Sequence, residues 1–193
     1  LMVVYTDSVT GNSSIRVNFN ITDNTNTTIN NMTYADAFLN GVSNDWSSTT
    51  VACHTGQHAN GIVVNINNVT TANDYSRSYL GGPINMFVGD GRTGYTYSLA
   101  DFMSTSAHEF GHAGFHVYDI YHYTDPNTGS TKRTDPNISV PFKSIMNYQF
   151  GLGGAQPVDY DIIFTNKTWT LNSWFYYSSD SNTLDKHIGA GNW

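Results

Sequence analysis

The sequence predicts a single α+β domain, and three observations lead to this prediction. Short segments in the first half of the chain alternate apolar and polar side chains, as half-buried strands do. Two longer segments instead repeat apolar side chains three and four residues apart, which is the period of an amphipathic helix. The length of 193 residues suits one domain built of two lobes around a cleft.

Alternating side chains predict three strands and a short fourth one. The three strands cover residues 14–21, 60–69 and 82–91, and the last of them ends in a Gly-rich turn. Residues 94–99 predict a short edge strand. The Gly-x-Gly-x-x-Gly run at residues 89–94 follows a strand, but no helical period comes after it. We therefore expect a tight turn there rather than a dinucleotide site.

A helix that backs the sheet is predicted over residues 33–46. Phe38, Val42 and Trp46 are spaced four residues apart, so they lie on one apolar face of such a helix. Thr33 stands immediately before this pattern and is a suitable N-cap, because its hydroxyl can accept from a free backbone N–H of the first turn.

Composition and charge narrow the classes of partner. The net charge is −7 with eight Lys plus Arg, and no basic run is present, so we expect no nucleic-acid partner. Apolar runs are too short for a membrane span. Charged residues make up only 12%, and Asn, Thr and Ser supply most of the polarity. We expect a secreted or extracellular monomer, and the single cysteine, Cys53, allows no internal disulfide.

The chemistry of the chain is concentrated in a second predicted helix, residues 103–116. It contains the run His-Glu-Phe-Gly-His at residues 108–112. His108 and His112 lie four residues apart, so both imidazoles point from one helix face and can bind one zinc ion. Glu109 is turned about 100° from His108, where it reaches a zinc-bound water rather than the metal. This pattern is typical of peptide hydrolysis with Glu109 as the general base.

Catalytic zinc takes three protein ligands, and several residues could supply the third. The candidates are His116, Tyr118, Asp119 and His122. On one straight helix His116 would stand about 12 Å along the axis from His108, which is too far for a shared ion. The chain must bend first, and Gly114 is a position where it could do so. Beyond such a bend Asp119 can return to the metal.

The runs "HEFGHAGFHVYD" and "SIMNY" resemble the metzincin clan of zinc metallopeptidases. "GDGRTGYTY" and "TSAHEFGH" also resemble zincin-like domains of bacterial secreted and polymorphic toxin proteins. The resemblance implies that His108 and His112 bind zinc and that Glu109 is the base. It further implies that Met146 is the Met-turn methionine below the zinc and that Tyr148 binds zinc or the oxyanion. The edge strand at residues 94–99 would pair with an extended substrate.

The chain departs from this clan at the third ligand. Phe115 stands where the clan has glycine, and Tyr118 stands where it has the ligand. One inserted residue in the turn would bring Asp119 to the ligand position, so we favour Asp119, and His116 is the next candidate.

The resemblance implies a two-lobed metzincin-like domain over residues 1–193. The upper lobe, residues 1–117, would hold a twisted sheet, the backing helix and the active-site helix. The lower lobe, residues 118–193, would be mostly irregular and hold the Met-turn. Residues 125–130 have the alternating oxygens of a calcium loop but lack its distal glutamate, and ordinary turn chemistry also explains them.

The expected function is that of a secreted zinc endopeptidase acting on proteins or peptides. Two alternatives stay open. The domain could be a catalytically weak zincin-fold binding module that uses its aromatic tail, or a zinc amidase acting on a cell-wall substrate.

Overall fold

The computed structural model describes residues 2–47, 49–53, 61–79, 81–115, 122–124, 131–133 and 145–146. The chain divides into two compact units, Leu1–His116 and Val117–Trp193. Each unit is described by itself below. Within the described residues no helix combines the length and apolar character needed to cross a membrane.

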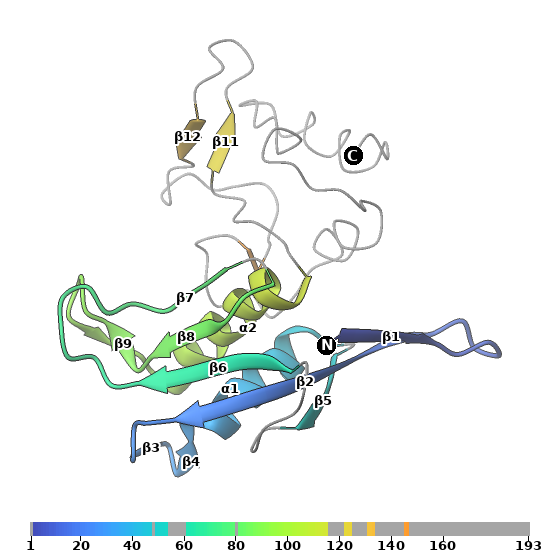
Figure 1. The fold of residues 1–193 in the computed structure, drawn as a ribbon, viewed down its shortest axis with the longest axis horizontal. Helices are drawn as coiled ribbons and strands as arrows, with labels where there is room; N and C mark the ends of the chain where they lie inside the picture. The colour runs from blue at the N-terminus through green and yellow to red at the C-terminus, as the bar shows by residue number, and fades with distance from the viewer. Residues whose placement is uncertain are drawn as a thin grey trace. The chain divides into compact units, whose positions relative to one another are not determined.

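A six-stranded, mostly parallel sheet forms the centre of the first unit, as Figure 1 shows. Its strands follow the order β1-β2-β6-β8-β7, and β5 also pairs with β2. Strands β5 and β6 are parallel to β2, and β8 is parallel to β6, whereas β1 and β7 are antiparallel to their neighbours. These strands are β1 (Met2–Thr6), β2 (Ser13–Asp23), β5 (Thr49–Cys53), β6 (Ile62–Asn67), β7 (Arg77–Ser78) and β8 (Ile84–Phe87).

The remaining strands form three small antiparallel pairs. In the first unit these are β3 (Thr28–Ile29) with β4 (Met32–Thr33) and β9 (Gly89–Asp90) with β10 (Tyr95–Thr96). In the second unit β11 (His122–Thr124) pairs with β12 (Thr131–Arg133). Residues 125–130, which have the alternating oxygens of a calcium loop, fall between β11 and β12 and lie outside the described residues.

Helix α1 (Tyr34–Asp45) begins where the sequence predicts. The hydroxyl of Thr33 accepts from the Asp36 backbone N–H at 3.0 Å and donates to the Asp36 carboxylate at 2.7 Å. This reciprocal pair satisfies a donor of the first turn. The carboxylate of Asp23, at the end of β2, accepts from the Ala35 N–H at 3.2 Å and so ties the helix start to the sheet.

Helix α2 (Leu99–Phe115) carries the histidine motif and begins four residues earlier than predicted. Ser98 and Asp101 cap its start, because the Asp101 N–H donates to the Ser98 hydroxyl at 3.2 Å while the Ser98 hydroxyl donates to the Asp101 carboxylate at 2.5 Å. Further along, α2 crosses α1 closely. A Cβ placed on Gly41 of α1 would stand 2.3 Å from the Met103 carbonyl oxygen, so only glycine fits at this crossing.

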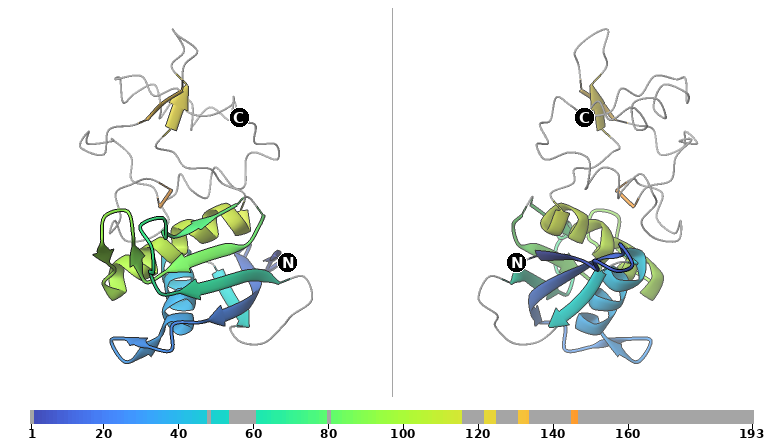
Figure 2. Two further views of the ribbon diagram at one scale, coloured as in Figure 1. Left: turned by 60° about the vertical axis from the view of Figure 1, so that its left-hand side comes forward. Right: turned by 90° about the vertical axis from the view of Figure 1, so that its right-hand side faces the viewer.

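Both helices cover one face of the sheet, as Figures 1 and 2 show from three directions. The core between these layers is aromatic at its centre. The Phe19 ring of β2 packs edge-on against Phe38 of α1 at 5.4 Å and near Phe110 of α2 at 5.7 Å, measured between ring centroids. Aliphatic side chains of the parallel strands complete this core, namely Ile15, Val17, Val64, Ile66, Ile84 and Met86.

The predicted strands at residues 14–21, 60–69 and 82–91 correspond to β2, β6 and β8 with β9, and the predicted α+β class agrees with this mixed architecture. The predicted short edge strand at residues 94–99 corresponds in part to β10. The structure has only Tyr95–Thr96 as a strand there, and it pairs with β9 outside the main sheet. Among the described strands, β1 and β7 stand at the two ends of the main sheet. Residues 91–94 form the turn between β9 and β10, with Gly94 at φ +72°, as the tight-turn prediction requires.

Candidate metal centre

Two histidines of α2 stand side by side. The ring centroids of His108 and His112 are 4.9 Å apart and the rings are perpendicular. Two imidazoles that share one zinc through Zn–N bonds of ~2.1 Å at a tetrahedral angle have centroids about 5 Å apart. The pair therefore fits two ligands of one zinc ion, because the helical spacing already sets the separation that the metal requires.

Glu109 lies between these histidines in sequence and is as buried as His108, each side chain being 6% exposed. A buried carboxylate is costly unless it is hydrogen-bonded. The hydroxyl of Ser78 lies 2.7 Å from Oε2 of Glu109 and 2.9 Å from its backbone carbonyl oxygen. In the described part of the chain no other side chain hydrogen-bonds this carboxylate, so most of its acceptor capacity is left for groups such as a water or a substrate.

Strand β7 and the turn after it lie beside the part of α2 that contains the motif. Ser78 reaches Glu109, and three residues later the Gly81 N–H donates to the His112 carbonyl at 3.4 Å. The sheet edge is thus fastened to the helix at two residues of the motif.

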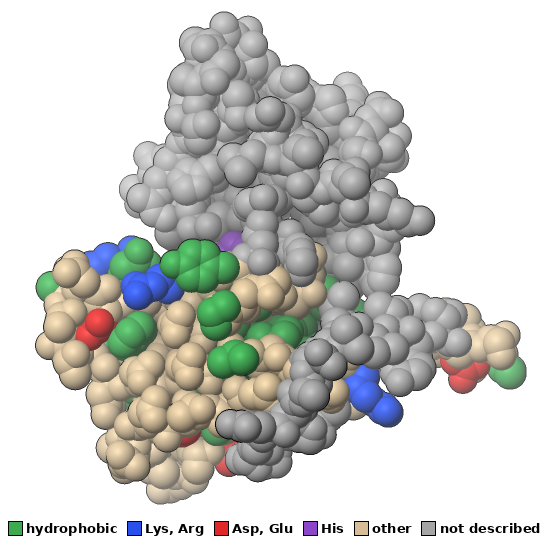
Figure 3. Space-filling model, in the orientation of Figure 1, with side chains coloured by type: hydrophobic (Ala, Val, Ile, Leu, Met, Phe, Trp, Pro, Cys, Tyr) green, Lys and Arg blue, Asp and Glu red, His purple; other side chains and the backbone are tan. Residues whose placement is uncertain are grey.

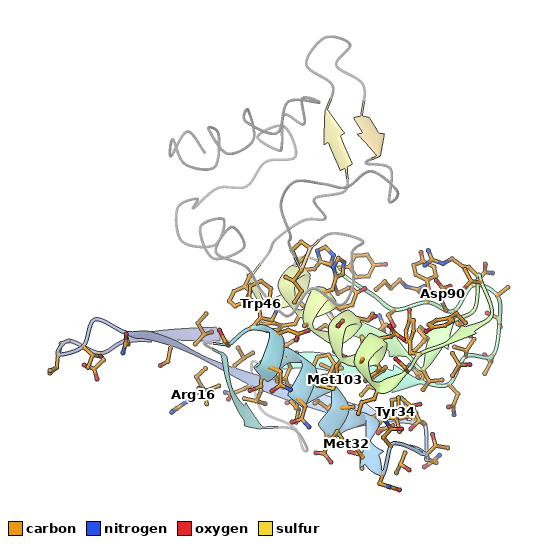
Figure 4. The ribbon with its side chains drawn as sticks, turned by 180° about the vertical axis from the view of Figure 1, so that it is seen from behind. Arg16, Met32, Tyr34, Trp46, Asp90 and Met103 are labelled. Atoms are coloured by element: carbon orange, nitrogen blue, oxygen red, sulfur yellow. The ribbon has the colours of Figure 1, made fainter. Side chains whose placement is uncertain are left out.

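The other side of α2 is held by α1. The indole N–H of Trp46, which caps the end of α1, donates to the Ala107 carbonyl at 2.9 Å. The Trp46 ring is fully buried and packs against Phe110 and Phe115 at centroid distances of 6.2 and 4.6 Å. Figure 4 shows Trp46 at the end of α1 nearest α2. Since Ala107 precedes His108, this bond fixes the helix directly beside the motif.

A charged and aromatic cluster lies beside β7. The Arg92 guanidinium forms a two-point ion pair with Asp90, at 3.0 and 2.7 Å, and stands 4.0 Å over the Tyr75 ring. Arg77 stands over the same ring at 5.0 Å. Basic side chains accordingly gather beside hydrophobic ones over the β7 and β9 end of the molecule (Figure 3). This cluster, called the basic patch below, carries one net positive charge, because the Asp90 carboxylate offsets that of Arg92.

Tyr97 carries a hydroxyl group near the motif, and the charge of Glu109 affects its pKa. Burial raises the pKa of Tyr97, and the carboxylates of Asp90 and Glu109 raise it further. Its hydroxyl therefore stays protonated at neutral pH and able to donate.

The predicted third ligands are not brought to the pair within the described residues. Asp119, His116 and Tyr118 lie outside those residues, and His122 is on β11 with only its backbone described. Across the part of the chain that is described, no group of three or more His, Cys, Asp or Glu side chains could hold a metal.

Gly114, the predicted bend, lies within α2, where a Cβ would meet the Phe110 ring at 2.4 Å. A bend toward Asp119 would therefore come after Phe115. Met146 is fully buried in a turn at residues 145–146 of the second unit. Tyr148 lies outside the described residues.

Sequence reasoning did not find Ser78. No motif surrounds it, and it lies 31 residues before Glu109, so only the sheet pairing of β7 brings the two together. The chain was compared with protein-family models, curated proteins and solved structures, and none of the three comparisons gives a match. The chemistry of the centre therefore has to be argued from its own residues.

Proposed function

We propose that the chain is a zinc-dependent endopeptidase that acts outside the cell on proteins or peptides. The observation that carries this proposal is one helix face with paired imidazoles at zinc-ligand separation, His108 and His112, next to a buried carboxylate, Glu109. A purely structural helix has no need to bury a carboxylate next to an imidazole, as Glu109 and His108 are buried here. The metzincin-like motif in the sequence points to the same activity.

In this proposal His108 and His112 hold the zinc with Asp119 as the third ligand. The bound zinc supplies a Lewis acid that polarises a carbonyl and makes water acidic near neutral pH. Glu109 takes the proton of the attacking water on its carboxylate and passes it to the departing amine. Tyr148 stabilises the developing oxyanion, a contribution of about 3 kcal/mol for a well-aimed donor. The metzincin-like motif would make Met146 the methionine of the Met-turn.

The sheet edge suggests how a substrate is bound. Strand β7 has β8 on one side only among the described strands, so an extended peptide can add to its other side through backbone hydrogen bonds. Arg77 belongs to this strand, and Arg92 shares the Tyr75 ring with it. Opposite charges on adjacent strands attract, so this patch favours peptides with acidic side chains.

The test combines metal content and cleavage. We expect wild-type protein dialysed against a weak chelator to keep about one zinc per chain and to cleave an unstructured protein substrate. Glu109→Ala should keep the zinc and lose cleavage, because it removes the base and no ligand. Asp101→Asn is the matched control, since it removes a different carboxylate of α2 and should stay active. Cleavage retained by Glu109→Ala would exclude the mechanism.

The same assay separates the alternatives and the third ligand. Asp119→Ala should lose zinc and His116→Ala should keep it. A wild-type protein without zinc would defeat the enzyme proposal and leave the binding module. Zinc with hydrolysis of peptidoglycan, but not of protein, would point to the amidase.

A further inference from the structure

The hydroxyl of Ser78 makes two contacts with one residue of α2. It lies 2.7 Å from the Glu109 carboxylate and 2.9 Å from the Glu109 backbone carbonyl. Both are hydrogen-bond distances, and a hydroxyl has one proton but two lone pairs. Ser78 therefore donates to one of the two oxygens at a time, while staying within reach of both.

A glutamate side chain has three rotatable bonds, so an unattached carboxylate exchanges between several orientations. A general base must instead lie within about 3 Å of the proton that it takes. A donor fixed outside the helix can select one orientation. Ser78 is such a donor, because its strand is paired to β8 through Ser78↔Ile84 and the following turn is bonded to His112.

We propose that Ser78 is a positioning residue that holds the Glu109 carboxylate in the orientation needed for catalysis. This inference rests on the proposed function. Strand β7 would then do two things. Its backbone would pair with the substrate, and its Ser78 side chain would orient the Glu109 carboxylate. Both hydrogen bonds that join the Ser78 hydroxyl to α2 go to Glu109.

A merely structural role is the competing explanation, because the contact with the backbone carbonyl could serve only to fasten β7 to α2. The two roles differ in their dependence on the Glu109 side chain. Replacing Glu109 with alanine removes the carboxylate contact and leaves the carbonyl contact. A double-mutant cycle with Ser78→Ala and Glu109→Ala therefore separates them.

The chain offers a matched control on the same strand region. Ser76 also uses its hydroxyl to bind the sheet, accepting from the Phe87 N–H at 3.0 Å, but it makes no hydrogen bond to Glu109. Ser76→Ala therefore removes a comparable serine contact without releasing the base. Ser78→Thr keeps a hydroxyl at the critical position and suits a strand, since threonine is favoured there.

The first experiment measures kcat, KM and bound zinc for these variants on the peptide substrate of the wild type. We expect Ser78→Ala to keep its zinc and KM while kcat falls about 10–100-fold, the effect of losing one hydrogen bond to a charged group. Ser78→Thr should recover most of kcat, and Ser76→Ala should match wild type. Unchanged kcat in Ser78→Ala would overturn the inference, and so would loss of zinc or a dominant rise in KM.

The second experiment does not depend on activity. Urea unfolding of the zinc-free single and double variants should give a coupling of about tenfold in the folding equilibrium constant. Additive effects would show that Ser78 binds only the backbone, and would overturn the inference. If the zinc-loaded wild type cleaves no peptide, the proposed function fails, and this cycle alone still decides whether Ser78 holds the carboxylate.

Discussion

The close crossing of the two helices makes Gly41→Ala an informative perturbation. In a helix without tertiary contacts this change stabilises by about 0.8–1.0 kcal/mol, because alanine has the higher helix propensity. At residue 41 the new Cβ would stand 2.3 Å from the Met103 carbonyl oxygen and 2.7 Å from the Met103 Cα, whereas ordinary contact begins at 3.4 Å. Figure 4 shows Met103 where the helices meet. The expected sign is therefore the reverse of the propensity effect.

The magnitude follows from the shortfall of about 1 Å between the contact distance and the distance available. Both obstructing atoms belong to the backbone, so the helices must separate instead of one side chain rotating. A gap of that size forfeits up to about half of the dispersion energy of the atom pairs across the interface. Overpacking of this kind costs about 1–3 kcal/mol. After subtraction of the propensity gain, we expect a net loss of about 0–2 kcal/mol in the free energy of unfolding.

Equilibrium urea unfolding followed by circular dichroism measures this difference directly. Asn44→Ala is the control, because Asn44 lies on the same helix, is exposed and should show only the propensity gain. A Gly41→Ala variant that is stabilised by about 1 kcal/mol, like an unconstrained helical glycine, would refute the tight crossing. It would also show that α2 does not approach α1 this closely at Met103.

Three further changes test other contacts. Trp46→Phe loses the hydrogen bond to Ala107 and leaves a small cavity. The free energy of unfolding, measured by urea titration, should therefore fall by about 2–3 kcal/mol. An unchanged free energy of unfolding would contradict the indole hydrogen bond. The Ser98 hydroxyl lowers the pKa of Asp101 below its ordinary 3.8. Asp101 therefore stabilises the fold above that pH. This stabilisation disappears as the pH falls through the pKa that Asp101 has in the folded state. Asp101→Asn should therefore melt about 2–4 °C lower than wild type at pH 7, a gap that closes in acid, and an equal gap at both pH values would exclude this origin. Arg77→Ala should lower kcat/KM for acidic peptides about 1.5–5-fold relative to neutral ones, and an unchanged ratio would remove the basic patch from substrate binding.

Much of the first unit could be predicted because its pattern is local. Alternation over residues 14–21 identified β2, and the four-residue spacing of Phe38 and Val42 identified α1. The Thr33 cap was also predictable, since capping depends on residues three apart in the chain.

Strand β7, which was not predicted, has no such local signal. The β7 strand has two polar or charged residues, Arg77 and Ser78, and becomes a strand only because β8 pairs with it. At residues 94–99 the strand-like composition did predict a strand, but it did not show that this strand pairs with β9 outside the main sheet. Pairing between strands depends on residues far apart in the sequence, and composition alone does not identify the partner.

By itself the sequence determined the motif helix and the facing of its two histidines, because helical geometry places residues four apart on one side. Only the tertiary structure decided what surrounds them. It placed Ser78 against Glu109 and Trp46 against Ala107, contacts that span 31 and 61 residues of chain. The physical reason is the same in both cases. Local spacing sets the direction of a side chain, whereas its hydrogen-bond partners are set by how the sheet and helices pack.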